Sequence, residues 1–212
     1  MDANSVIDGL IMFIGLVILL TFHEFGHAWM ALKCGDDTAK LQGRVSLNPL
    51  VHIDPIGTVV IPIAAILIGG LLIGWARPVP VNPYNLRNQK LDDILVTLAG
   101  PWMNVILAVV LIGLMRFGQV INIPALEEIG ARWALLSLFL CFFNMLPIPP
   151  LDGSQVVRAV CNISYEAYYQ FARWGFLILI VVIQIPLVQS ALQSLTRGSF
   201  LAIARLFRVA LS

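Results

Sequence analysis

Residues 6–27, VIDGLIMFIGLVILLTFHEFGH, join a long apolar run to a compact polar cluster with no helix breaker between them. The run is apolar as far as Phe22 and is interrupted only by Asp8 and Thr21. This pattern predicts one continuous helix over about 6–32, which is long enough to cross a bilayer. Ionisable side chains in such a helix are costly in hydrocarbon and are usually functional, so the polar cluster is the first candidate for chemistry.

The composition of the 212-residue chain agrees with a membrane location. Hydrophobic residues make up 59% and charged residues 12%, and the mean hydropathy is +0.88, whereas a soluble domain is about one quarter charged. A soluble fold could not bury so much apolar surface, which excludes a water-soluble enzyme and a disordered chain. The net charge of +1, with no long basic run, argues against nucleic acid as a partner. Three widely spaced cysteines argue against a disulfide framework or a thiolate metal site.

Four further apolar runs follow the first. They cover 56–75, 92–115, 133–146 and 174–195. The chain is therefore predicted to be a single all-α polytopic membrane domain over 1–212, with a core at 6–153 and a C-terminal span and tail at 154–212. The tail at 197–212 carries Arg205 and Arg208 on an apolar background, which indicates a short interfacial helix.

The connections between the runs have their own signals. The polar stretch 33–54 has weak strand character at 38–47, between glycine and proline bounds. The segment Arg77-Pro78-Val79-Pro80-Val81-Asn82-Pro83 has too many prolines for a helix and is predicted to be extended. A polar link is expected at 116–132.

The polar cluster His23-Glu24-Phe25-Gly26-His27 has the spacing of a metal site. Residues four apart on a helix share a face, so both imidazoles can reach one metal ion, and Glu24 lies beside them. Two His ligands with a Glu as general base are typical of zinc hydrolases. His23 lies about 26 Å along the helix from Val6, within a hydrocarbon core about 30 Å thick. The metal is therefore expected inside the membrane, near the face opposite the N-terminus.

A tetrahedral zinc site needs a third protein ligand, and few groups are placed to supply one. His52, Asp54 and Asp152 remain after carboxylates in distant or polar segments are set aside. Asp152 follows a proline-rich break at the end of a span, but it could equally cap a turn in Leu-Asp-Gly. His52 is either a group near the developing oxyanion or a solvated loop residue.

Three segments together resemble a known family. They are His23-Glu24-Phe25-Gly26-His27, Gly100-Pro101-Trp102-Met103-Asn104, and Asn144-Met145-Leu146-Pro147-Ile148-Pro149-Pro150-Leu151-Asp152-Gly153. In this order, and on hydrophobic spans, they are similar to the site-2 protease type of intramembrane zinc metalloproteases. The segments 43–52 and 77–82 look like motifs of a compact prokaryotic branch. No room is left for the PDZ or CBS domain of some relatives, or for their extra N-terminal span.

The resemblance implies a function and a set of site residues. It implies that His23, His27 and Asp152 bind one zinc ion and that Glu24 is the catalytic base. It also implies that Asn144 lies by the metal and places substrate or stabilises the oxyanion, and it favours a catalytic role for His52. The expected activity is hydrolysis of a membrane-spanning protein substrate. The expected location is the plasma membrane of a prokaryote, with the active site near the cytoplasmic face.

Two residues outside these motifs also carry expectations. Asn104, within an apolar run, is expected to bond between helices. Val79 and Val81, extended between prolines, could pair with an unwound substrate as an edge strand or could belong to a stiff surface connector.

The ligands constrain the topology. His23 and His27 lie at the exit end of the first span and Asp152 at the exit end of the span that starts at Trp133, so both spans must run in the same direction. If 56–75 and 92–115 both crossed fully, the ligands would lie about 30 Å apart. We therefore expect about four full transmembrane helices plus a re-entrant or half-membrane hairpin at 56–75, where Pro62 and Gly69-Gly70 offer a bend, with short extended segments near the active site.

Two other classes of function compete with proteolysis. The same intramembrane His and Asp residues could serve a metal or ion transporter, or a zinc-binding scaffold without activity. Neither alternative has a need for Glu24, so its presence favours the hydrolase.

Overall fold

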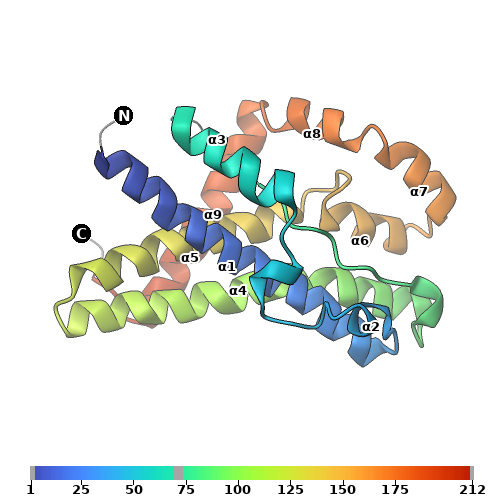
Figure 1. Ribbon diagram of the computed structural model, residues 1–212, viewed down its shortest axis with the longest axis horizontal. Coiled ribbons are helices and arrows are strands. Elements are labelled where there is room, and N and C mark those ends of the chain that lie inside the picture. The colour runs from blue at the N-terminus through green and yellow to red at the C-terminus, as the bar shows by residue number, and fades with distance from the viewer. Residues whose placement is uncertain (1–2, 69–73, 211–212) are drawn as a thin grey trace.

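Helices form all the regular structure of the computed structural model, which describes residues 3–68 and 74–210 (Figure 1). The all-α expectation is confirmed for these residues. The strand character expected at 38–47 is wrong, because α2 (Thr38–Leu41) is a helical turn there. Asp36 Oδ1 accepts hydrogen bonds from both the backbone N and Oγ1 of Thr38, and such a side-chain turn starts a helix rather than a strand.

Three long helices build the frame of the molecule: α1 (Ala3–Cys34), α4 (Gln89–Val120) and α5 (Pro124–Asn144). The predicted first helix is confirmed. Figure 1 shows α1 and α5 running the same way from the N-terminal side, with α4 running back. The polar link expected at 116–132 is wrong, since only residues 121–123 separate α4 from α5. Gly118 allows this tight connection, because a Cβ there would lie 2.7 Å from Glu127 N.

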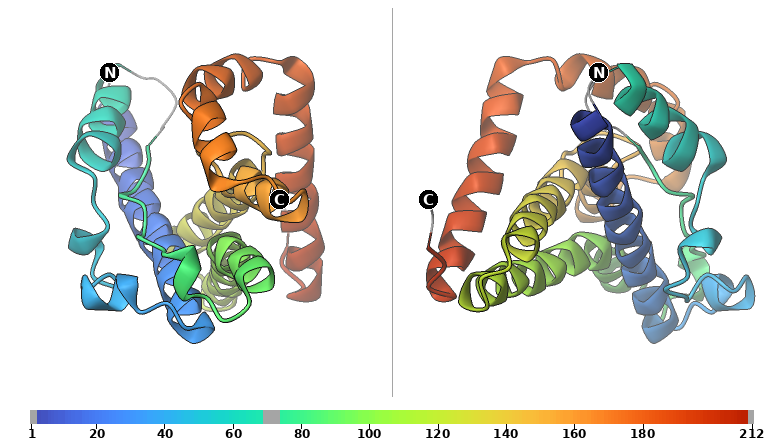
Figure 2. Two further views of the ribbon diagram at one scale, coloured as in Figure 1. Left: turned by 90° about the vertical axis from the view of Figure 1, so that its right-hand side faces the viewer. Right: turned by 60° about the vertical axis from the view of Figure 1, so that its left-hand side comes forward.

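The C-terminal part of the chain belongs to the core. α8 (Gly175–Val182) and α9 (Pro186–Leu206) are bent by 81° at a break, so the run 174–195 is not one straight helix. Pro186 lacks the N–H that would continue α8. α9 packs beside α5 (Figure 2), and a shared core joins α4, α5 and α9. Its buried residues are Ala108, Ile112, Met115, Ala134, Leu138, Phe200, Ala204 and Val209. The expected interfacial helix at 197–212 is therefore wrong.

The two ends of the segment 56–75 lie next to each other. It begins as a π-helix, η2 (Pro55–Val60), and continues as α3 (Ile61–Ile68). Trp75 N donates to Gly57 O at 3.1 Å, and Thr58 Oγ1 donates to Trp75 O at 2.7 Å. The two ends therefore lie side by side, as the hairpin hypothesis requires. The bend expected at Gly69-Gly70 lies outside the described residues.

α3 extends along α1 as far as its first turns, which is further than a hairpin that enters only half of the membrane would reach. A Cβ on Gly9 would lie 2.8 Å from the Ile66 side chain, so the end of α3 packs near the start of α1 (Figure 1). After the hairpin, residues 75–82 contain no helix, which agrees with the extended segment expected from the prolines.

Short helices complete the described chain. They are η1 (Pro49–Val51), η3 (Pro83–Asn85), α6 (Asp152–Val160) and α7 (Tyr165–Ala172). By length and composition, two described helices can cross a bilayer, namely Ser5–Cys34 of α1 and Gln89–Val120, and a third is possible if α8 and α9 form one span. α5 has 21 residues but carries Glu127, Glu128 and Arg132. The expected count of four full spans stays a prediction.

The position of α9 in the core gives the first testable prediction. Ala204 is fully buried, so Ala204→Leu should overpack the contact with α4 and α5 and lower the free energy of unfolding by about 1–3 kcal/mol. Ala202 is exposed on the same helix, and Ala202→Leu is the matched control. Thermal unfolding of both variants in one detergent makes the comparison. Equal melting temperatures would show that α9 does not pack as described.

Candidate metal centre

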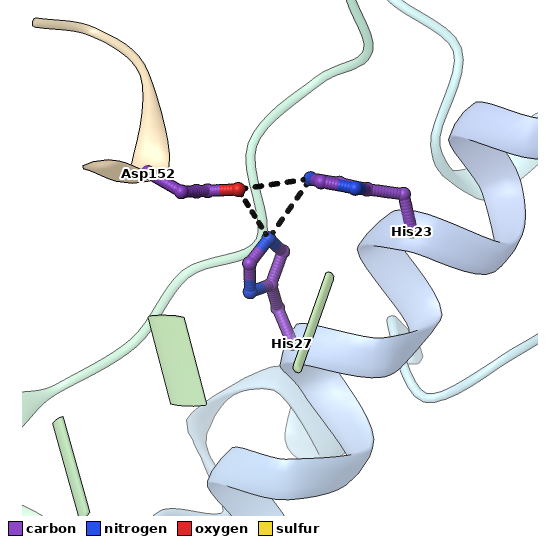
Figure 3. A group of neighbouring side chains, drawn as sticks. All are labelled: His23, His27 and Asp152. Carbon is purple, nitrogen blue, oxygen red and sulfur yellow. Dashed lines mark hydrogen bonds and ion pairs between the residues drawn. The ribbon is translucent and has the colours of Figure 1, made fainter. Parts of the chain in front are cut away.

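Three side chains from two distant segments meet at one point (Figure 3). Asp152 Oδ2 lies 3.2 Å from His23 Nε2 and 3.4 Å from His27 Nε2, and the two Nε2 atoms are 3.1 Å apart. The histidines come from consecutive turns of α1, and Asp152 is the first residue of α6. Both imidazoles are buried, and Asp152 is half-buried. The structure thus brings together the three residues that the sequence proposed as ligands.

The donor atoms of this cluster fit a tetrahedral metal ion. Ligands about 2.0–2.2 Å from one zinc lie about 3.3–3.5 Å from one another in that geometry, close to the spacing observed. Asp152 Oδ2 is buried and has no hydrogen-bond donor among the described residues. His27 Nδ1 lies 2.8 Å from the Val96 carbonyl, which fixes the proton on Nδ1 and leaves Nε2 with a lone pair. Acceptor atoms that face one another so closely need a proton or a metal ion between them, and the tetrahedral spacing suits a metal.

Asn104 of α4 supports the second imidazole. It is fully buried, and its amide lies 3.1 Å from His23 Nδ1, so the expected bond between helices joins α4 to α1. Asn104 Oδ1 has no partner among the described residues. If the amide is turned by 180°, Oδ1 accepts the Nδ1 proton of His23 and frees Nε2 for a metal. Metal-binding histidines usually donate their other N–H in this way.

Two glycines let the helices approach closely enough to form the centre. A Cβ on Gly100 would lie 2.2 Å from His27 Nε2 and 2.7 Å from His23 Nε2, so only glycine fits against the imidazoles. A Cβ on Gly26 would lie 2.7 Å from the Ala99 carbonyl, so this glycine brings α1 against α4. Both glycines lie inside the motifs quoted above, and the absence of a side chain at each lets α1 and α4 pack closely.

Glu24 is held by the extended segment that follows the hairpin. Its Oε2 accepts a hydrogen bond from Val79 N at 3.0 Å. Arg44, which is buried, fixes that segment, because its Nη2 donates to the carbonyls of Arg77 and Pro78 at 2.5 and 3.3 Å. Glu24, the residue expected to be the general base, therefore lies beside the candidate ligands and has a defined partner.

The far end of the same segment is tied to the end of α1. Asp36 Oδ2 accepts from Asn82 N at 2.7 Å, and Oδ1 accepts from Asn85 Nδ2 at 3.0 Å. Burial raises the pKa of Asp36, but the hydrogen bonds from Thr38, Asn82 and Asn85 outweigh it and hold the pKa below its ordinary value. Asp36 is therefore a charged anchor at neutral pH.

His52 and Asn144 have defined partners outside the three-residue cluster. His52 is buried, and its Nε2 lies 2.8 Å from the Ser46 carbonyl while its own carbonyl accepts from Arg77 N at 2.9 Å. Burial is the largest influence on His52 and lowers its pKa, so the ring is neutral at pH 7 and Nε2 carries the proton. Asn144 Nδ2 donates to the Leu140 carbonyl at 2.9 Å. The catalytic roles expected for both residues stay predictions.

The sequence reasoning missed Val96 and the bond from Val79 to Glu24, and it anticipated Asn104 only as a bond between helices and Gly100 only as part of a motif. Val96, Gly100 and Asn104 follow one another at four-residue spacing, so they share one face of α4. The signal for Gly100 and Asn104 was present, since a glycine and an amide four apart interrupt an apolar run. Val96 acts through its carbonyl, and Val79 through its N–H, so neither leaves a mark in the sequence.

Comparisons with known proteins agree with this geometry. The model of the family described as peptidase family M50 matches residues 11–130 and 111–183. A Bacillus subtilis protein named "Putative zinc metalloprotease YwhC" is 37% identical over 202 residues, which are 92% of this chain and 89% of that protein. No solved structure matches the chain.

More distant relatives are longer than this chain. "Putative zinc metalloprotease Rip2" of Mycolicibacterium smegmatis is 33% identical over 175 residues, which are 81% of this chain and 66% of that protein. "Zinc metalloprotease MJ0392" of Methanocaldococcus jannaschii is 28% identical over 165 residues, which are 76% of this chain but 38% of that protein.

The close fit at Gly100 gives a prediction about metal binding. In Gly100→Ala the added methyl group would occupy the space of the His27 ring, so the purified variant should lose most of its bound zinc. Gly113→Ala on the same helix is the control, because its methyl group would lie 3.5 Å from Phe207 in ordinary contact. Metal analysis of both purified proteins makes the measurement. A full zinc complement in Gly100→Ala would contradict the assignment of this cluster as the metal site.

Proposed function

The chain belongs to peptidase family M50, and we propose that it cleaves membrane-spanning proteins within the bilayer, with His23, His27 and Asp152 as zinc ligands and Glu24 as general base. Its class is that of a zinc metalloendopeptidase, in agreement with the names of its relatives. The observation that carries the residue assignment is the meeting of two imidazoles and one carboxylate on an apolar helix, with separations that suit one zinc ion.

The reaction divides between the metal and the protein. Zinc, when bound, supplies a Lewis acid that polarises a carbonyl and acidifies water. Glu24 takes a proton from the attacking water and passes it to the leaving amine. The Val79 N–H holds the Glu24 carboxylate on one oxygen, which leaves the other oxygen to act as the base. Asn144 and His52 are proposed to stabilise the developing oxyanion or place the substrate.

The substrate is proposed to bind in an extended form. A transmembrane helix already uses its carbonyls in hydrogen bonds, so the scissile bond must unwind before it can be attacked. In an extended strand the backbone groups of Val79 and Val81 point to one edge, and the Val79 bond to Glu24 directs that edge toward the base. Pro78 and Pro80 have no N–H to offer on the opposite edge. Because the Val79 N–H is donated to Glu24, a substrate strand can pair at the valine edge through the Val79 carbonyl and the backbone groups of Val81.

The placement in the membrane is proposed from charge and from the hairpin. Segments 33–92 and 153–173 hold eight Lys or Arg, whereas the N-terminus and 116–132 hold two and the tail at 197–212 holds three, and on this count the metal-side connections are assigned to the cytoplasm. Lys33 lies over the ring of Trp29 at 5.6 Å, an arrangement typical of a membrane interface. The active site then lies near the cytoplasmic face of the plasma membrane.

The proposed base can be tested separately from the proposed ligands. Glu24→Gln keeps an oxygen for the Val79 N–H but cannot accept the proton, so cleavage of a single-span substrate should fall about 10²–10⁴-fold with zinc retained. Asp152→Ala should instead lose zinc. Full zinc content in Asp152→Ala would refute the ligand assignment. Undiminished cleavage by Glu24→Gln would refute the base, and metal transport that survives the change would favour a transporter.

The topology proposal has its own test. Leu50 and Tyr84 are exposed and flank the segment 56–75, so cysteines at both positions should react with an impermeant maleimide from the same side of the membrane. Ile121→Cys, at the turn between α4 and α5, should react from the opposite side. The measurement uses intact cells and inverted vesicles in a background without native cysteines. Labelling of the Leu50 and Tyr84 positions from opposite sides would mean that the segment crosses once.

A further inference from the structure

A buried ion pair lies outside the metal centre. Arg158 of α6 and Asp93 of α4 are both buried, and the Arg158 guanidinium contacts Asp93 Oδ2 directly. The same guanidinium donates through Nε to Gln155 at 3.1 Å and lies 3.9 Å from the centre of the Tyr165 ring. The Tyr165 hydroxyl donates to Asp93 at 3.3 Å. Several contacts thus fix the orientation of both charged side chains, whereas an exposed ion pair on the surface usually has no such additional contacts.

The helix that carries Asp152 cannot set its own position. α6 has nine residues, and isolated helices shorter than about 12 residues are marginal in water. Its N-cap, Leu151, makes no side-chain cap hydrogen bond. Asp152 is its first residue, and Arg158 lies about 9 Å further along the axis. The place of the carboxylate therefore depends on the contacts of α6 with its surroundings, which are those of Gly153 and Ser154 at its start and those of Arg158 near its end.

The ion pair connects α6 to α4, the helix that also contacts the two histidines of α1. Val96, Gly100 and Asn104 of α4 contact the two imidazoles, as described above. Asp93 lies three residues before Val96 and therefore on the same face of α4. One face of one helix thus contacts both parts of the centre, the imidazoles directly and Asp152 through Arg158.

We propose that Asp93 and Arg158 are a positioning pair that sets the Asp152 carboxylate against the two histidines. This inference rests on the proposed role of Asp152 as a zinc ligand. Neither member of the pair touches the metal or the substrate. Their effect is on the distance between α4 and α6, and hence on the third ligand.

Zinc affinity and the geometry of the bound metal test the pair directly. Asp93→Asn and Arg158→Gln should each weaken zinc binding about 10–100-fold in competition with a chelator, as loss of a supporting group around a metal ligand does. The double variant should be no weaker than the worse single variant, because both changes break the same link. With Co²⁺ in place of zinc, the visible absorption of all three should lose the intensity typical of a tetrahedral site.

Matched variants separate positioning from general loss of structure. Lys90→Gln removes a solvent-exposed contact between α4 and the end of α6 and should leave zinc affinity within about twofold of the unaltered protein. Arg158→Lys keeps the charge but loses the fork and the ring contact, so it should bind zinc with intermediate affinity even if the neutral variants do not fold.

The outcomes test the positioning role of the pair separately from the role of Asp152 as a ligand. Folded Asp93→Asn or Arg158→Lys protein with unaltered zinc affinity and an unaltered Co²⁺ spectrum would overturn the positioning role. Zinc retained in full by Asp152→Ala would instead overturn the ligand assignment on which the inference rests. A selective loss of zinc affinity in the Asp93 and Arg158 variants, with Lys90→Gln unaffected, is the expected result.

Discussion

The structure depends on one constraint, which is that the proposed ligands His23, His27 and Asp152, from distant parts of the chain, must meet at one point in an apolar surrounding. α4 satisfies it with a single face. Val96 and Asn104 contact the imidazoles of α1 through hydrogen bonds, and Gly100 leaves the space they occupy. Asp93, on the same face, contacts α6. The distance between the ligands is therefore fixed by the turns of one helix rather than by the long connections between the segments.

Most of the polar groups around the candidate centre are tolerated because they have a hydrogen-bond partner. A buried amide, imidazole or carboxylate without a partner costs several kcal/mol in hydrocarbon. Ser137 donates to the Asn104 carbonyl at 2.7 Å, so even the backbone of the supporting residue is held. Two buried oxygens of the centre have no donor among the described residues, Asn104 Oδ1 and Asp152 Oδ2, and Asp152 Oδ2 is the one directed at the imidazoles. The arrangement of satisfied and unsatisfied atoms thus points to a metal.

Features that depend on residues close together in the sequence could be predicted, and features that depend on distant residues could not. The first helix, the pair His23 and His27 and the extended segment at 77–82 are local patterns, and all three appear in the structure. The strand at 38–47, the link at 116–132 and the interfacial tail were wrong because a side-chain turn, a tight helix connection and packing against α5 override local composition. The pair Asp93 and Arg158 was invisible, since the two residues lie 65 positions apart and no local pattern links them.

The extended segment joins the base to the rest of the site. Glu24 lies on α1, yet its carboxylate is oriented by Val79, and Val79 is placed by the contacts of Arg44 with the two preceding carbonyls. Pro78 has no N–H to donate, so the segment is held here by the bonds from Arg44 to the Arg77 and Pro78 carbonyls. The hairpin return at Trp75 and the bond from Asn82 to Asp36 fix the two ends of the same segment. The hairpin proposed for the topology therefore also places the segment that orients Glu24, the proposed base, so the two proposals depend on one element of structure.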